Sequence, residues 1–133
     1  MKQYTSKIFI LLGIYVLILS ACSYYDEKAI AVSGVYDSYV VNGNYDFELT
    51  ISLDGNDDVT IEGLWDDYDW KFVRADLDDR EGGTIDFDIR SQQVYGGPRL
   101  WGDGIWINGY FQLDYNIDWG PETIRYRMIA NQY

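Results

Sequence analysis

From residue 31 onward, apolar and polar residues alternate along the chain, and clusters of glycine, asparagine and aspartate interrupt them about every ten to fifteen positions. A period of two is typical of half-buried β-strands, and frequent turns are typical of sandwiches and barrels. The pattern predicts strands at residues 32–41, 46–53, 59–65, 70–77, 84–92, 101–107, 110–119 and 123–131. No stretch after Cys22 has the period of a helix. We therefore expect an all-β fold, an eight-stranded antiparallel up-and-down meander that forms a small barrel or a strongly curled sheet after an N-terminal signal helix.

The turns predict how neighbouring strands pair, because a two-residue Asn-Gly loop places its flanking residues opposite each other. Such loops occur at residues 42–43 and 108–109. In the second hairpin, a turn at 54–58 predicts the pairs Leu53 with Val59, Ile51 with Ile61, Leu49 with Gly63 and Phe47 with Trp65. A last turn at 120–122 predicts Trp119 with Ile124, Ile117 with Tyr126, Tyr115 with Met128 and Leu113 with Ala130, and it places Asp118 beside Arg125. The apolar pairs share one face, as a correct register requires.

The strand at 101–107 contains two glycines that this register places on the inner face. Gly102 lies across from Tyr115 and Gly104 across from Leu113, so the missing side chains leave room for the tyrosine ring. A phosphate-cradling loop is the alternative interpretation of a glycine-rich stretch, but no helix follows this one.

The strand at 70–77 fits the alternation poorly. Strict alternation from Phe72 drives Arg74 into the core, whereas a bulge near Phe72 turns Val73, Ala75 and Leu77 inward instead. We favour the bulge. An inward Arg74 would be the best candidate for a buried charge that binds an anionic ligand.

The residue inventory excludes several kinds of active site. The chain has no histidine and a single cysteine, so Ser-His-Asp catalysis, Cys-His catalysis and histidine-ligated zinc are excluded. Glycosidase chemistry needs only two carboxylates, but nothing singles out a pair among the 22 acidic residues. A loose calcium site at 54–58 or 76–81 stays open, although Val59 and Trp65 stand where an EF-hand needs glycine and glutamate. We expect a protein that is not an enzyme, with no cofactor and no metal.

The N-terminus has the composition of a secretion signal. Lys2 and Lys7 precede an apolar run at residues 8–19, which is too short to span a bilayer comfortably. The run closes on Leu19-Ser20-Ala21-Cys22, which resembles the lipobox of bacterial lipoproteins. The resemblance implies a signal peptide at 1–21 and an acylated Cys22. A tether at 22–30 then precedes the barrel domain that the alternating pattern predicts at 31–133. An uncleaved anchor helix and a plain signal peptide with an unrelated cysteine are the alternatives.

The net charge of the mature chain limits the classes of partner that it can bind. After removal of residues 1–21, 8 lysines and arginines face 22 acidic residues, a formal net charge of −14. Nucleic acid and anionic lipid headgroups are poor partners for such a surface, whereas cationic ligands, divalent ions and neutral sugars stay open. The charge alternatively serves only to keep the protein soluble.

Several segments carry a family resemblance. They are Thr84-Ile85-Asp86-Phe87 with Ser91-Gln92-Gln93, Gly102-Asp103-Gly104, Tyr110-Phe111-Gln112-Leu113-Asp114-Tyr115, the closing strand and the lipobox. With them the chain looks like the small lipocalin-like, calycin-type lipoproteins of Bacteroidetes and related bacteria. The resemblance implies an eight-stranded barrel or curled sheet on a lipid tether, usually without a defined activity, in the outer membrane on its periplasmic or surface side. The chain lacks the Gly-x-Trp opening and the C-terminal helix of true lipocalins, so neither ligand transport nor any binding residue is carried over.

Aromatic residues are expected both inside the barrel and at one end of it. The inner face should carry Tyr36, Phe47, Trp65, Phe72, Phe87, Trp106, Phe111, Tyr115, Trp119 and Tyr126, with Trp70. An eight-stranded barrel is narrow enough for side chains to fill it. In a meander, the loops near residues 42, 66, 97 and 121 share one end, and this end should carry the predicted ligand site: Trp65, Tyr68, Trp70, Trp101 and Trp119 beside Asp66, Asp67 and Asp69.

Three functions are compatible with this sequence. The first is a lipid-anchored, non-enzymatic barrel that binds a small polar or cationic ligand, a glycan first, or a protein partner at its tryptophan-rich end. The second is a structural or assembly accessory of the outer membrane with a filled barrel. The third is an acidic inhibitor of a cationic enzyme.

Overall fold

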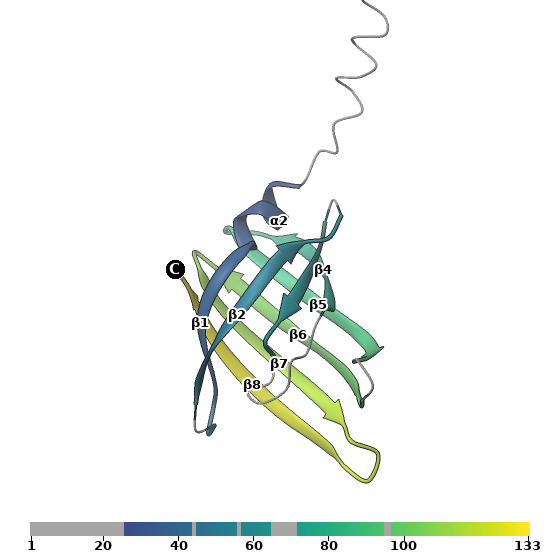
Figure 1. The fold of residues 1–133 in the computed structure, drawn as a ribbon. Helices are drawn as coiled ribbons and strands as arrows, with labels where there is room; N and C mark the ends of the chain where they lie inside the picture. Colours follow the sequence, from purple (N-terminus) through teal and green to yellow (C-terminus); the bar gives the residue numbers. More distant parts are fainter. Residues whose placement is uncertain (1–25, 44, 56, 65–71, 95–96) are drawn as a thin grey trace, which may run out of the picture.

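The computed structural model of the protein describes residues 26–43, 45–55, 57–64, 72–94 and 97–133. Within these residues a short helix precedes eight strands: α2 (Glu27–Val32), β1 (Gly34–Val40), β2 (Asp46–Leu53), β3 (Asp58–Glu62), β4 (Val73–Arg80), β5 (Thr84–Gln93), β6 (Arg99–Ile107), β7 (Tyr110–Asp118) and β8 (Thr123–Gln132). Each strand pairs with the next, and β1 pairs antiparallel with β8, so the sheet closes into a barrel (Figure 1). The predicted all-β meander is therefore confirmed, in its barrel form.

Three hairpins have the predicted registers. In β1 and β2, Tyr39 lies opposite Asp46, which is the register that a two-residue loop at 42–43 sets. In β2 and β3, Leu53 lies opposite Val59 and Ile51 opposite Ile61. This ladder ends before Gly63, which lies outside β3, but Gly63 still lies against β2: a Cβ atom added to it would be 2.6 Å from the carbonyl oxygen of Glu48. The turn at 108–109 connects β6 directly to β7, and both of its residues have the positive φ that a two-residue type I′ turn requires.

The predicted register of the last hairpin is wrong by two residues. Ile117 pairs with Ile124 and Tyr115 with Tyr126, whereas the prediction paired Ile117 with Tyr126. The turn is tighter than predicted, because the Trp119 N–H donates to the Glu122 carbonyl at 2.9 Å and so continues the register of the two strands up to Gly120 and Pro121. A register shift of two residues leaves every side chain on its predicted face of the sheet. It also separates Asp118 from Arg125, since Asp118 pairs with Thr123.

The chain reverses its alternation at Phe72, directly before β4. Phe72 has a φ of 70°, which is uncommon for a residue other than glycine, and its side chain is 64% exposed. The residues that follow it on the inner face, Val73, Ala75 and Leu77, are all buried. The bulge interpretation is therefore confirmed, and the placement of Phe72 on the inner face is wrong. Arg74 points outward and is not a buried charge.

Aromatic rings fill the middle of the barrel. Tyr36, Phe87, Phe111 and Tyr115 are buried, and the ring centroids of Phe87 and Phe111 lie 4.5 Å apart. Burial of each such ring contributes about 2 kcal/mol to folding. The two glycines of β6 face Tyr115 and Leu113, as predicted. The other predicted inner residues differ in burial: Trp106 is buried, Phe47, Trp119 and Tyr126 are partly buried at the edge of the core, and Trp65 and Trp70 lie outside the described residues.

Helix α2 contradicts the expectation that no helix follows Cys22. Asp26 caps the helix by accepting a hydrogen bond from the Lys28 N–H at 3.2 Å. Ala29 and Val32 are buried in the barrel core, and the Tyr36 hydroxyl donates to the Val32 carbonyl. The second half of the expected tether is therefore packed against the barrel. A six-residue helix is too short for its period to be recognised in the sequence.

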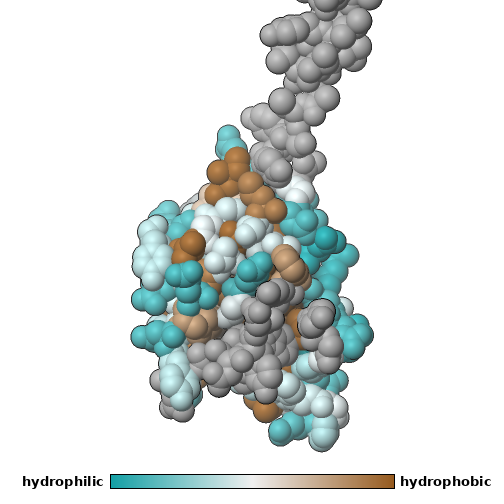
Figure 2. Space-filling view, viewed as in Figure 1, coloured by the Kyte–Doolittle hydropathy of each residue, from teal (hydrophilic) through white to brown (hydrophobic). Residues whose placement is uncertain are grey.

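The loops alternate between the two ends of the barrel, as a meander requires. The β2–β3, β4–β5 and β6–β7 turns lie at the end that carries α2, which we call the anchor end (Figure 1). The β1–β2 and β7–β8 turns lie at the opposite end. Figure 2 shows a group of hydrophobic residues at the anchor end, and a wall on which hydrophilic residues predominate with some hydrophobic ones among them. No helix in the described part of the chain has the length and apolar character needed to cross a bilayer.

Candidate functional site

The structure describes only two members of the predicted ligand site. Trp65, Asp66, Asp67, Tyr68, Asp69 and Trp70 all lie outside the described residues. Trp101 lies on the outer face of β6, opposite Asn116 and half-buried. Trp119 follows β7 and packs against the edge of the core. These two tryptophans therefore lie on different faces of the barrel wall and do not form one cluster.

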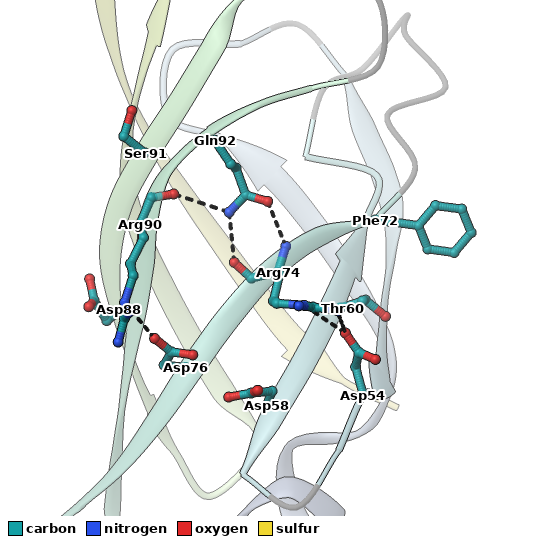
Figure 3. Close-up of a pocket in the computed structure, with 10 residues that line it drawn as sticks. All are labelled: Asp54, Asp58, Thr60, Phe72, Arg74, Asp76, Asp88, Arg90, Ser91 and Gln92. Carbon is teal, nitrogen blue, oxygen red and sulfur yellow. Dashed lines mark hydrogen bonds and ion pairs between the residues drawn. The ribbon is translucent and has the colours of Figure 1, made fainter.

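A groove of about 660 Å³ lies on the outer wall, over β3, β4 and β5 (Figure 3). We call it the outer groove. It combines carboxylates, guanidinium groups, hydroxyls, an amide and one exposed aromatic ring, from Asp54, Asp58, Thr60, Phe72, Arg74, Asp76, Asp88, Arg90, Ser91 and Gln92.

Phe72 and Arg74 form one edge of the outer groove. The reversal at Phe72 projects its ring from the wall and aims Arg74 along the outer surface (Figure 3). The Arg74 Nε and Nη2 atoms both lie 2.9 Å from Oδ2 of Asp54, in the β2–β3 turn. Because the arginine side chain is largely exposed, this ion pair contributes less than about 1 kcal/mol to stability. Its effect is to fix the direction of the guanidinium group.

Gln92 takes the place of a backbone partner for β4. The pairing of β5 with β6 is irregular between Ile89 and Gln92, and the β4–β5 ladder ends at the Asp76–Asp88 pair. Beyond that pair, the Arg74 N–H donates to Oε1 of Gln92 at 3.0 Å, and Nε2 of Gln92 donates to the Arg74 carbonyl at 2.8 Å. The side-chain amide thus satisfies both backbone groups of Arg74 and holds the groove floor in place.

Carboxylates dominate the rest of the outer groove. Asp58 lies directly opposite Asp76, and Asp76 directly opposite Asp88. The pKa of Asp58 is raised, first because burial disfavours its charged form, and then by its hydrogen bond with Asp76 and by the negative charge of that residue. A raised carboxyl pKa means that the folded state binds the proton more tightly, so this pair favours folding more at acidic than at neutral pH.

The strand registers extend these carboxylates into a row across the outer wall. Each member is the direct cross-strand neighbour of the next, in the order Asp58, Asp76, Asp88, Asp103 and Asp114, and Arg127 follows Asp114. We call these five residues the acidic row. Like charges placed directly opposite each other destabilise a sheet, by about 0.2 to 1 kcal/mol for each pair. The row therefore works against folding unless counter-charges relieve it.

Arginines neutralise the negative charge of only some members of the acidic row. Nε of Arg90 lies 2.9 Å from Oδ2 of Asp76, and Nε of Arg127 lies 2.7 Å from Oδ1 of Asp114. The Arg127 hydrogen bond lowers the pKa of Asp114. Asp88 and Asp103 are exposed and have no ion-pair partner among the described residues.

Neither the groove nor the row could be found by inspecting single strands. Alternation places all of these residues outward, but only the registers across β3–β4 and β5–β6 bring them together. Those registers depend on long connections, at residues 63–72 and 94–98, whose geometry the sequence does not predict. The Asp103–Asp114 pair is the exception, because it follows from the predicted turn at 108–109.

Comparison with known proteins assigns no family: no family model, curated protein or solved structure matches this chain. The fold and the groove define a small closed β-barrel with a polar groove on its outer wall. The resemblance to lipocalin-like lipoproteins stays a prediction. No group of three or more His, Cys, Asp or Glu residues in the described ranges is placed to hold a metal ion, the turns at 54–55, 57–58 and 76–81 included.

Proposed function

We propose that this chain is a lipid-anchored, non-enzymatic binding protein of the cell envelope, and that the outer groove holds a small polar ligand, a glycan first. The observation that carries the proposal is the Phe72 ring, 64% exposed at the edge of a groove of polar side chains. An exposed aromatic face can stack on the apolar face of a sugar. Carboxylate, guanidinium and amide groups that line the same groove can bond to sugar hydroxyls as acceptors and donors.

The charges of the outer groove favour some sugars over others. Four aspartates line it, and its two arginines are already paired with Asp54 and Asp76. A sulfated or carboxylated sugar would meet uncompensated negative charge there, whereas a neutral or amine-bearing sugar would not. We therefore expect neutral and amino sugars to bind before acidic ones.

Replacing Phe72 with alanine tests this proposal. The stacking contribution of one aromatic ring is about 1 kcal/mol, so Phe72→Ala is expected to weaken binding of the best sugar by about five- to tenfold. The measurement is an NMR titration of the barrel with neutral, amino and acidic saccharides. The matched control is Ile105→Ala, which removes an exposed apolar side chain from the outer face of β6, away from the groove, and should leave binding unchanged.

Two results would contradict the proposal. If the NMR chemical shifts changed only in the β7–β8 loop and not at Arg74 or Gln92, the ligand site would lie at the end of the barrel opposite α2 and not in the outer groove. No response to any saccharide would favour the accessory function with a filled barrel.

A second function, binding to a cationic protein surface, is favoured by the acidic row. We expect Asp88→Asn with Asp103→Asn to slow association with a cationic enzyme several-fold at low salt and to reduce the salt dependence of the rate. The control, Asp37→Asn with Glu48→Gln, removes the same charge from another part of the outer wall, where these two residues face each other. Equal effects of both double variants in stopped-flow measurements would show that only net charge matters.

A further inference from the structure

Exposed apolar side chains gather at the anchor end of the barrel. Ile30 on α2 is 55% exposed, and Ile107 and Tyr110, which flank the β6–β7 turn, are 42% and 40% exposed. We call these three residues the anchor-end patch. Figure 2 shows hydrophobic residues at this end of the barrel.

Hydrogen bonds from the end of β8 hold α2 and the β6–β7 turn at the same place. The Gln132 N–H donates to the Gly109 carbonyl at 2.8 Å, and its Nε2 donates to the Ser33 carbonyl at 2.9 Å and the Ala31 carbonyl at 3.3 Å. Ile107 and Tyr110 are direct cross-strand neighbours on the outer face. The three residues of the patch therefore lie on elements that Gln132 joins by hydrogen bonds at this end of the barrel.

Charge divides the anchor end into two halves. The β6–β7 turn consists of Asn108 and Gly109 and carries no charge, and the neighbouring end of β8 carries none either. The acidic residues of this end lie in the β2–β3 and β4–β5 turns, among them Asp57 and Glu81, and at the start of α2, where Asp26 is paired with Lys28 and Glu27 follows it. A surface that covers the apolar half must therefore tolerate acidic neighbours, which favours zwitterionic or uncharged lipids over anionic ones.

The short segment between Cys22 and α2 limits how far the anchor-end patch can lie from an acylated Cys22. If Cys22 carries the lipid, as the proposed function holds, four residue steps separate it from Asp26, the N-cap of α2. At 3.3 to 3.6 Å per residue, they span at most about 14 Å. The anchor end is therefore held within reach of the lipid headgroups, and no long tether separates it from them.

We propose that the anchor end of the barrel rests on the bilayer, with the anchor-end patch among the headgroups of zwitterionic lipids. This inference rests on the lipid anchor of the proposed function and adds a fixed orientation to it. Three side chains are too few to bind a membrane alone, but the acyl anchor makes their contact effectively intramolecular. The opposite end then faces away from the membrane, and the outer groove on the side wall stays open to soluble ligands.

The test uses the full acylated chain on phosphatidylcholine vesicles. Ile107→Cys, in the patch, and Val41→Cys, an exposed position near the opposite end, each receive a fluorescent label on the only free thiol. A quencher attached to the lipid headgroup is expected to reduce the fluorescence at position 107 several-fold more than at position 41. Ile30→Ser with Tyr110→Ser should remove most of this difference while the protein stays on the vesicles.

The possible outcomes separate the orientation from the anchor. Equal quenching at both positions, with the protein still floating with vesicles, would overturn the orientation and leave the anchor standing. Equal flotation of the intact chain and of Cys22→Ser would overturn the anchor and this inference with it. A label at position 107 that is already shielded in the Cys22→Ser protein without vesicles would show that a protein surface, and not lipid, covers the patch.

Discussion

Gly102→Ala is expected to destabilise the barrel by about 3 kcal/mol, the upper end of the range for overpacking a core. A Cβ atom on Gly102 would lie 2.3 Å from the carbonyl oxygen of Asp114 and 2.7 Å from the Cα of Tyr115. Both are backbone atoms of β7, so no side-chain rotation can relieve the contact. The two strands would have to separate where the buried Tyr115 ring crosses the barrel. Thermal unfolding should show a fall in Tm of more than about 10 °C.

Two alanine substitutions in the same strand calibrate this result. Gly104→Ala should cost less, about 1 to 2 kcal/mol, because its single backbone contact, the Gln112 carbonyl oxygen, would lie 2.8 Å from the new Cβ atom, and its other two contacts are side-chain atoms, Leu113 Cδ1 and Phe111 Cε2, each at 3.0 Å. Asp103→Ala, between the two glycines but on the outer face, should not destabilise the barrel, because it removes a carboxylate that lies directly opposite Asp88 and Asp114. If Gly102→Ala were no more destabilising than Asp103→Ala, the close approach of β6 and β7 would be disproved.

Local patterns predict most of this barrel because each hairpin carries its own register signal. The alternation fixes which side chains face inward, and the Asn-Gly turn at 108–109 fixes the pairing of Gly102 with Tyr115. The last hairpin shows the limit of such signals. Its turn is tighter than predicted: the Trp119 N–H donates to the Glu122 carbonyl, and the Asp118 carboxylate accepts a hydrogen bond from the Gly120 N–H, both at 2.9 Å. The sequence signals a turn there but not its length.

The features that escaped prediction depend on contacts between distant segments. Helix α2 exists because Ala29 and Val32 find a buried surface at the barrel end, not because six residues favour a helix by themselves. The outer groove depends on the reversal at Phe72 and on the Gln92 amide, 18 residues away from Arg74 in sequence. Outward polar residues give no periodic signal, so a site built from them becomes visible only when the strands are aligned.

Alkaline pH is expected to unfold this barrel through two buried tyrosines. Burial raises the pKa of Tyr36 to about 12, although the neighbouring Trp106 ring lowers it somewhat. Burial also raises the pKa of Tyr115 well above its usual range, and the nearby Tyr126 adds to this effect. In the unfolded chain both hydroxyls ionise near pH 10. Above that pH the unfolded state releases protons that the folded state keeps, so stability falls as pH rises.

The slope of the free energy of unfolding against pH gives the number of tyrosines responsible for the fall in stability. Each buried tyrosine contributes about 1.4 kcal/mol per pH unit between its unfolded and folded pKa values, so the pair should cost about 4 to 5 kcal/mol between pH 10 and 12. Denaturant unfolding at a series of pH values measures the slope, and phenolate absorbance reports when the buried rings ionise. Tyr36→Phe should halve the slope, although it also removes the donor to the Val32 carbonyl and so lowers stability at neutral pH. Replacing the exposed Tyr45 with phenylalanine should leave the slope unchanged. A slope that Tyr36→Phe does not alter would show that the alkaline transition has another origin.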